Sequence, residues 1–143
     1  MIFSQDRYQL RKLFVDSWNK LQNKQPLTAI EEQIARIIEL HPEYHNDIIF
    51  ENIDKDYSPD MGQINPFLHI SLHLAIIEQV QTNRPFGISD AYKRLLKKHN
   101  HDEHKVHHIM IEYLAEEMWK SQRYNTAPDE NQYLQKLQEL LLK

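Results

Sequence analysis

The hydrophobic residues of this chain recur at helical spacing along almost its whole length. Near the N-terminus they form a stripe at intervals of three and four residues, the period of one helix face. That stripe consists of Leu10, Phe14, Trp18 and Leu21. Thr28 and Glu31 then stand at the T-x-x-E spacing of a capping box, which marks a helix N-terminus. These patterns predict a first helix over about 4–23 and a second over about 28–40.

Proline and asparagine residues mark the next helix starts. Pro42 suits the first turn of a short third helix that runs to about residue 50, because the missing N–H of proline is not needed there. Residues 51–64 read as a loop. Asn65 followed by Pro66 combines an N-cap residue with proline in the first turn. This pair predicts a fourth helix that ends near residue 82.

Three further helices are expected toward the C-terminus. Ser89 can cap a fifth helix to about residue 98, and Asn100 or Asp102 a sixth to about residue 124. Pro128 begins a last helix, and no stretch of the chain alternates apolar and polar residues with the period of a strand. The pattern therefore predicts an all-α protein, a compact helical bundle of about six or seven helices. Its 143 residues suit a single helical domain over residues 1–143.

The amino-acid composition excludes several classes of protein. The chain has no cysteine, so disulfides, thiolate metal sites and a cysteine nucleophile are excluded. Two glycines leave no material for a phosphate-binding loop. No apolar stretch approaches the roughly 20 residues of a membrane span, and no secretory signal is visible, so we expect a cytoplasmic protein without membrane contact. A net charge of −4 does not favour nucleic acid as a partner.

Nine histidines carry the candidate chemistry of the sequence. A random arrangement would give about half a pair at the i, i+4 spacing that makes helix residues neighbours. The chain has three such pairs: His41 and His45, His69 and His73, His104 and His108. The first pair straddles a predicted helix start, which leaves its geometry open. The other two lie within predicted helices, and Glu112 continues the line of His104 and His108 by one turn.

The two helical pairs predict a metal site. Imidazoles four residues apart on a helix can both reach one ion at about 2.0–2.1 Å from each nitrogen, and a glutamate one turn further can supply oxygen. If the fourth and sixth helices pack antiparallel, their side chains converge inside the bundle. The predicted metal ligands are His69, His73, His104, His108 and Glu112. Such donors suit a divalent zinc, iron, nickel or manganese ion.

A structural role for the same histidines is the competing interpretation. His69 and His73 can be buried rings hydrogen-bonded to backbone or carboxylate groups, and the cluster from His99 to His108 can be a weakly basic solvated face. The run KRLLKKHNHDEHK could contact RNA or an acidic protein, although charge runs of this length are usually solvated. No glutamate has a histidine three residues later, which disfavours a ferritin-like di-iron oxidase.

The chain resembles a family of small proteobacterial proteins known as domain of unknown function 1841. The resemblance rests on NPFLHISLHLAIIEQ, the later H-x-x-x-H-x-x-x-E element, AEEMWKSQR and PDENQYL, and it spans nearly the whole chain. It implies a bacterial cytosolic origin and assigns no activity. The positions that match the family pattern are Asn65, Pro66, Phe67, His69, His73, Glu78, His104, His108, Glu112 and Trp119.

Two functions remain open from the sequence. The first is a metal-binding protein: three protein ligands and a water would suit a metal-dependent hydrolase, and a shell filled by protein ligands would be structural. The second is a non-enzymatic interaction or assembly module, such as a homo-oligomer, whose terminal helices provide the docking surface. The sequence does not identify a small-molecule substrate.

Overall fold

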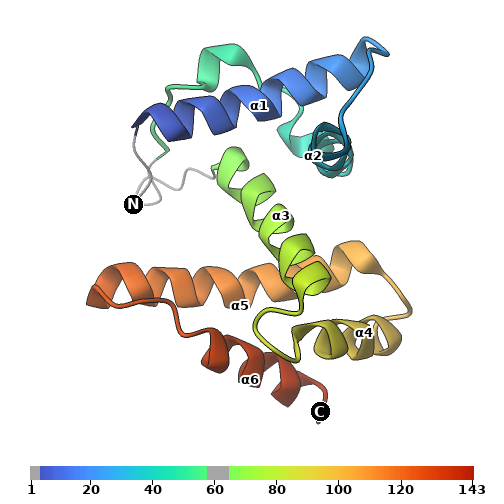
Figure 1. Ribbon diagram of the computed structural model, residues 1–143, viewed down its shortest axis with the longest axis vertical. Coiled ribbons are helices and arrows are strands. Elements are labelled where there is room, and N and C mark those ends of the chain that lie inside the picture. The colour runs from blue at the N-terminus through green and yellow to red at the C-terminus, as the bar shows by residue number, and fades with distance from the viewer. Residues whose placement is uncertain (1–3, 58–64) are drawn as a thin grey trace. The chain divides into compact units, whose positions relative to one another are not determined.

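The computed structural model describes residues 4–57 and 65–143, and these ranges contain six α-helices, two short 3₁₀-helices and no strand (Figure 1). The all-α prediction is confirmed. The α-helices are α1 (Ser4–Gln22), α2 (Ala29–Glu39), α3 (Pro66–Thr82), α4 (Ile88–Lys98), α5 (Glu103–Tyr124) and α6 (Glu130–Leu140). The 3₁₀-helices are η1 (Pro42–Tyr44) and η2 (Phe50–Asn52). No helix in the described ranges is long and apolar enough to cross a membrane.

The chain divides into two units, Met1–Ser71 and Leu72–Lys143, and the boundary between them falls within α3. The prediction of a single domain is not tested by this division and stays a prediction. Because α3 is one continuous helix, it supplies its first turns to the first unit and the remaining turns to the second.

In the first unit, α1 and α2 pack against each other. Of the predicted stripe of α1, Phe14 and Trp18 are buried, whereas Leu10 is 38% exposed. Phe14 and Val15 of α1 are fully buried, as are Ile34 and Ile38 of α2. The isoleucines of α2 recur at intervals of three and four residues, so one face of the helix is apolar. Arg11 of α1 also contacts Phe67 at the start of α3.

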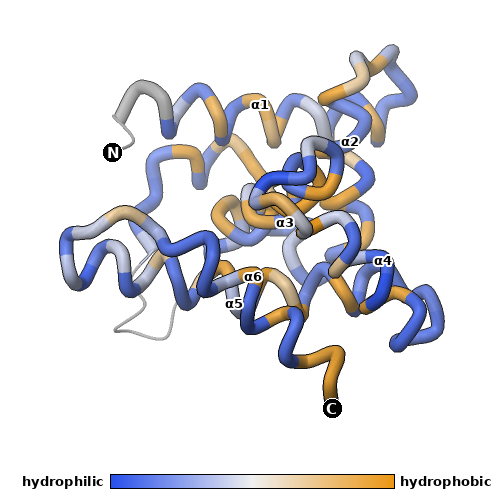
Figure 2. Tube along the Cα trace, turned by 60° about the horizontal axis from the view of Figure 1, so that its bottom comes forward, coloured by the Kyte–Doolittle hydropathy of each residue, from blue (hydrophilic) through white to orange (hydrophobic). Residues whose placement is uncertain are grey.

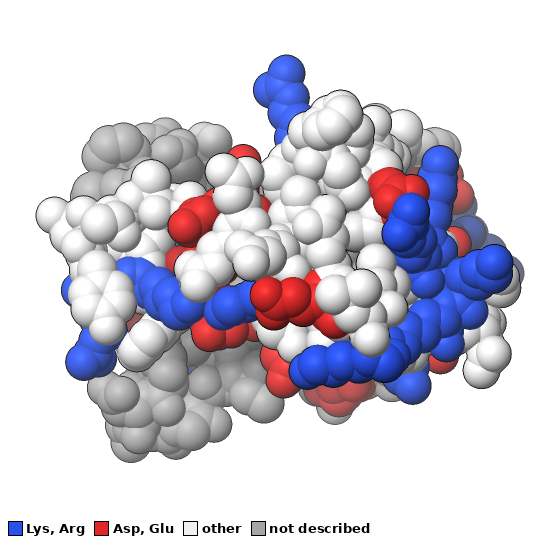
Figure 3. Space-filling model, turned by 90° about the horizontal axis from the view of Figure 1, so that it is seen from below, with Lys and Arg blue, Asp and Glu red and all other residues white. Residues whose placement is uncertain are grey.

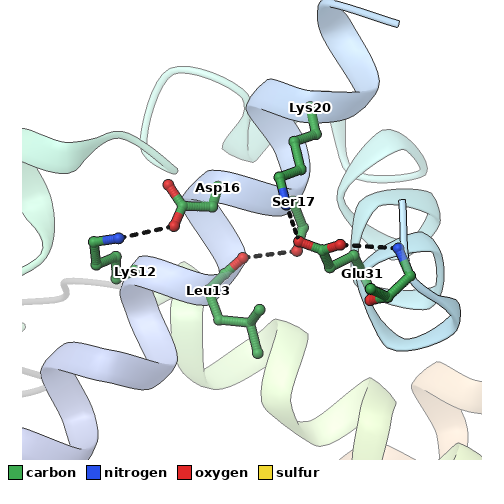
Figure 4. A network of polar contacts seen from close by, with 7 residues as sticks. Lys12, Leu13, Asp16, Ser17, Lys20 and Glu31 are labelled. Atoms are coloured by element: carbon green, nitrogen blue, oxygen red, sulfur yellow. Dashed lines mark hydrogen bonds and ion pairs between the residues drawn. The ribbon is translucent and has the colours of Figure 1, made fainter. Parts of the chain in front are cut away.

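The capping box at the start of α2 is confirmed, and it also ties α2 to α1 (Figure 4). Thr28 N–H donates to one carboxylate oxygen of Glu31 at 2.8 Å, and the Glu31 N–H donates to the Thr28 hydroxyl at 3.3 Å. The other carboxylate oxygen accepts from Lys20 Nζ of α1 at 2.6 Å. The Lys20 ammonium and the Thr28 N–H stabilise the charged form, so the pKa of Glu31 is lowered to about 2.

The predicted third helix over 42–50 is replaced by two separate 3₁₀ turns, η1 and η2. Pro42 occupies the first position of η1, as expected. The helix does not continue because Asn46 and Asp47 favour turns, and the side chain of Asn52 donates to the Asp47 carbonyl at 2.8 Å. The predicted loop over 51–64 is described only to residue 57, where its first residues belong to η2; residues 58–64 lie outside the described ranges.

A buried arginine holds the segment after η2 beside the start of α3. Arg11 of α1 donates from one nitrogen to the carbonyls of Ile53 at 2.9 Å and Lys55 at 2.7 Å. Its guanidinium carbon lies 4.9 Å from the centre of the Phe67 ring in the first turn of α3, a cation–π distance. This contact fixes the entry of α3 into the first unit, two residues before His69.

In the second unit, α4, α5 and α6 pack against one another, and one hydrophobic core joins them to the second part of α3. Its fully buried members include Ile76 of α3, Leu95 of α4, Met110 of α5 and Leu137 of α6. Tyr133 of α6 lies in this core and donates its hydroxyl to Gln79 of α3 at 2.8 Å. Figure 2 shows that the turn after α6, at 141–142, is apolar.

The start of α4 differs from the expected Ser89 cap. The N-cap position is Gly87, whose φ of 103° is in the left-handed region that favours glycine. Asn83 caps the helix from outside, because its side-chain oxygen accepts the N–H groups of Gly87 and Ser89, each at 3.1 Å. The Ser89 hydroxyl donates instead to the Val80 carbonyl in α3. The N-cap residues of α5 and α6 are aspartates, Asp102 and Asp129.

We expect the variant Glu31→Gln to lower the free energy of unfolding at pH 7, because it removes the charged acceptor shared by α1 and α2. An unfolded glutamate has a pKa of about 4.3, above the folded value of about 2. The stabilisation is therefore present above about pH 4.3 and is lost as the pH falls toward 2. Urea titrations at pH 7, 4 and 2 should show that the difference from wild type in the free energy of unfolding becomes smaller as the pH falls.

Glu32→Gln is the matched control, since Glu32 is an exposed neighbour 3.9 Å from Arg36. A loss of unfolding free energy in Glu31→Gln that is as large at pH 2 as at pH 7 would contradict this account.

Candidate functional site

The candidate site is built on the face of α3 that carries His69 and His73. Asn65 caps this helix, as predicted, because its side-chain oxygen accepts the N–H of Leu68 at 3.1 Å. The two histidines are one turn apart, so their side chains leave the helix on the same side. We call this side the histidine face of α3. His69 belongs to the first unit and His73 to the second.

In the first unit, His69 lies against His41 and Tyr44. The Nε2 atoms of His69 and His41 are 3.1 Å apart, and the two rings meet edge to face with their centres 4.8 Å apart. Tyr44 is stacked on His41 and meets His69 edge-on, with centre distances of 5.6 and 5.5 Å. His41 is 2% exposed, and His69 is half-buried. The pair is therefore held in largely desolvated surroundings, with an aromatic ring beside it.

In the second unit, His73 is surrounded by three imidazoles from α5. The Nδ1 atoms of His73 and His107 are 3.2 Å apart. The ring centre of His73 lies 5.7 Å from that of His104 and 5.1 Å from that of His108. His73 is 2% exposed, whereas the three rings of α5 are half-buried. These surroundings are unusual for a buried imidazole, because a buried polar group needs a hydrogen-bond donor or acceptor, or a metal ion, for each ring nitrogen.

The nitrogen spacings suit coordination of a metal ion. Two ligands of a tetrahedral ion with bonds of about 2.0–2.1 Å are roughly 3.3 Å apart. The 3.2 Å between His73 and His107 and the 3.1 Å between His41 and His69 are close to this value. Ligand atoms of His73 and His108 are also within 4.8 Å of each other. An N–H···N hydrogen bond has a similar length, so metal titration is the measurement that separates the two arrangements.

The electrostatic surroundings keep one of these rings neutral. Burial lowers the pKa of His107 to about 4, and the neighbouring His104 and His108 lower it further in the same direction. His107 is therefore uncharged at neutral pH and carries a nitrogen lone pair, the form of imidazole that binds a metal. Tyr92 of α4 meets the same ring edge-on at 5.8 Å and adds an apolar wall.

Glu112, the predicted oxygen ligand, is exposed. It lines a surface hollow of about 320 Å³ together with Lys98, His99, Tyr113 and residues at the end of α6. Three of the residues that line this hollow are thus basic: Lys98, His99 and Lys143. Its role as a ligand stays a prediction, which a Glu112 variant can test.

Of the predicted residues, His69 belongs to the first unit and the others to the second, and two further histidines lie beside them. His73 lies beside His104 and His108, with ring centres 5.7 and 5.1 Å away. His41 and His107 were not among the predicted ligands. His107 could have been found from its i, i+3 spacing to His104, which also makes neighbours on a helix. His41 was singled out only as the i, i+4 partner of His45. It follows the end of α2 and lies in no helix, so that spacing does not place it beside His69.

Basic side chains on α4 form a separate surface feature. Lys93, Arg94, Lys97 and Lys98 are all exposed, and Figure 3 shows Lys and Arg gathered at one side of the face it presents. Two of these cations are engaged within the chain: Arg94 pairs with Asp90 at 3.1 Å, and Lys98 Nζ donates to the carbonyl of Lys143 at 2.8 Å. Such engagement is typical of a solvated helix face.

Comparison with known proteins identifies a family and no characterised relative. No curated protein and no solved structure matches the chain. The family model described as "Domain of unknown function (DUF1841)" matches residues 6–139, which include every histidine discussed above. The chain belongs to this family.

Proposed function

We propose that this protein binds a divalent transition-metal ion through imidazoles on and around the histidine face of α3. The observation that supports the proposal best is the surroundings of His73. This ring is 2% exposed and has three imidazoles as neighbours, with one nitrogen 3.2 Å from a nitrogen of His107. Histidine is the commonest metal-binding side chain, and helical bundles commonly build such sites from facing helices.

The ligands that we propose are imidazoles from two helices of the chain. α3 contributes His69 and His73, and α5 contributes His104, His107 and His108, of which a subset binds at one time. Nitrogen donors without thiolate favour zinc, nickel or iron over magnesium and calcium, which take oxygen ligands. Zinc is the reference ion for the tests below, because it accepts a tetrahedral set of imidazoles without a redox change.

The number of protein ligands decides what the bound ion does. Three imidazoles leave one position for water, and zinc lowers the pKa of that water to about 7, so the ion can supply hydroxide for hydrolysis. Four imidazoles close the shell and make the ion structural. A metal-dependent hydrolase is the more specific form of our proposal, and it requires the open position.

The first prediction concerns zinc affinity. Wild-type protein purified without an affinity tag should compete for zinc with a chromophoric chelator. The variant His73→Gln should lose more than about 100-fold in affinity, because removal of a ligand costs more than the 10–100-fold that follows loss of an outer-shell partner. Circular dichroism verifies that the variant keeps its helices.

The control for this titration is His101→Gln, because His101 is an exposed histidine that lies outside the helices. We expect His101→Gln to bind zinc within about threefold of wild type, a change below 1 kcal/mol. Glu112→Gln tests the predicted oxygen ligand in the same assay: a loss of more than about tenfold would make Glu112 a ligand, and unchanged affinity would exclude it. If wild-type protein does not compete for zinc at all, or if folded His73→Gln binds as tightly as wild type, the proposal is wrong.

The second prediction separates hydrolytic from structural zinc. An open position should let zinc-loaded protein hydrolyse p-nitrophenyl acetate with a rate that rises through an inflection near pH 7, where the bound water ionises. Removal of zinc by a chelator should abolish the reaction. A zinc-loaded protein that shows no such rate, while its thermal unfolding temperature rises on zinc binding, would identify the ion as structural and contradict the hydrolase.

A further inference from the structure

We infer that His41 is a ligand of the metal held at His69 and that it binds through its Nε2 atom. This inference rests on the proposed metal-binding function and adds a residue from outside any helix. The two Nε2 atoms are 3.1 Å apart, and both rings belong to the first unit. Ligand atoms of the two residues also satisfy the spacing of a metal-binding group.

The backbone fixes which nitrogen of His41 carries the proton. Nδ1 of His41 lies 2.7 Å from the carbonyl oxygen of Ile37. A carbonyl oxygen only accepts, so Nδ1 must donate, and in the neutral ring the lone pair is then on Nε2. A ring N–H donated to a backbone carbonyl is the usual outer-shell partner of a metal-binding histidine, because it sets the tautomer and orients the ring. The Nε2 lone pair of His41 is directed at His69.

The end of α2 provides this carbonyl. The last carbonyls of an α-helix have no full set of helical partners, and Ile37 is in the last turn of α2. Pro42 disfavours helical backbone at His41, so the chain leaves α2 there and the ring turns back onto the carbonyl four residues earlier. The same hydrogen bond therefore completes the helix end and orients the ring.

The surroundings of His41 favour a ligand over a titrating surface group. The residue is 2% exposed, and the Tyr44 ring is stacked on it with an angle of 10° between the planes. A rigid, desolvated imidazole loses little conformational freedom on binding an ion, since its rotamer is already fixed. The pair of His41 and His69 thus has both the spacing and the preorganisation of a ligand pair.

His45 provides a matched contrast within the same short segment. It is the i+4 partner of His41 in the sequence, but its Nε2 lies 2.9 Å from the Ile38 carbonyl, so Nε2 is the nitrogen that donates. Its ring lies on Trp18, with centres 4.4 Å apart. His45 therefore uses the equivalent nitrogen for a backbone hydrogen bond, and we assign it a structural role.

The test compares the zinc affinities of His41→Gln and His45→Gln with wild type in the chelator competition. We expect His41→Gln to lose more than about 100-fold and His45→Gln to remain within about threefold. If wild-type protein does not bind zinc, the proposed function fails and this inference with it. If wild type binds zinc and folded His41→Gln binds equally well, the inference alone is wrong.

A second measurement needs no substitution and covers a His41→Gln variant that does not fold. Long-range ¹H–¹⁵N spectra of wild-type protein report the protonation of each imidazole nitrogen. Before zinc is added, His41 should show a protonated Nδ1 and an unprotonated Nε2; on saturation with zinc, Nε2 of His41 should shift strongly while the ring nitrogens of His45 do not. An Nε2 resonance of His41 that is unchanged by zinc would overturn the assignment.

Discussion

A buried ring nitrogen must have a partner, and this requirement governs the organisation of the histidines around α3. Removing a polar group from water without a hydrogen bond or a metal costs roughly 1–3 kcal/mol. His41 and His73 are each 2% exposed. Nδ1 of His41 lies 2.7 Å from the Ile37 carbonyl oxygen, and Nδ1 of His73 lies 3.2 Å from Nδ1 of His107. Two neutral imidazoles whose nitrogens meet share one N–H···N hydrogen bond, because each ring has one N–H and one lone pair. A metal ion is a partner that accepts several lone pairs at once.

The rest of the fold holds α3 where its histidines meet these partners. In the first unit, Arg11 fixes the segment before α3 and contacts Phe67, and the end of α2 orients His41. In the second unit, the core formed by α4, α5 and α6 sets the face of α5 against α3, so that His107 and His108 reach His73. The structural elements are conventional in their capping and packing. Their unusual feature is that the contacts between them bury imidazole rings, which are polar and contribute little apolar surface to a core.

The sequence predicts those features that depend on local spacing. The capping box of Thr28 and Glu31, the Asn65 cap and the helical stripes all follow from residues within a few positions of one another. The cap of α4 was missed because the Asn83 side chain accepts the N–H groups of Gly87 and Ser89, four and six residues later. No N-cap motif in the sequence has that spacing. The predicted helix after Pro42 was wrong because Asn46 and Asp47 favour turns, and hydrogen bonds of His45 to the Ile38 carbonyl and of Asn52 to the Asp47 carbonyl hold the turn conformation. Among the candidate ligands, His41 depends on tertiary packing alone, whereas His107 had a helical spacing that the i, i+4 criterion did not use.

The most direct test of metal binding on the histidine face of α3 is anomalous X-ray diffraction from crystals of zinc-loaded protein, recorded on both sides of the zinc absorption edge. The account predicts an anomalous peak at about 2.0–2.1 Å from imidazole nitrogens that include one of the α3 histidines, His69 or His73. A zinc peak confined to surface carboxylates or to His99 and His101, with the α3 histidines hydrogen-bonded to protein groups or water, would contradict it.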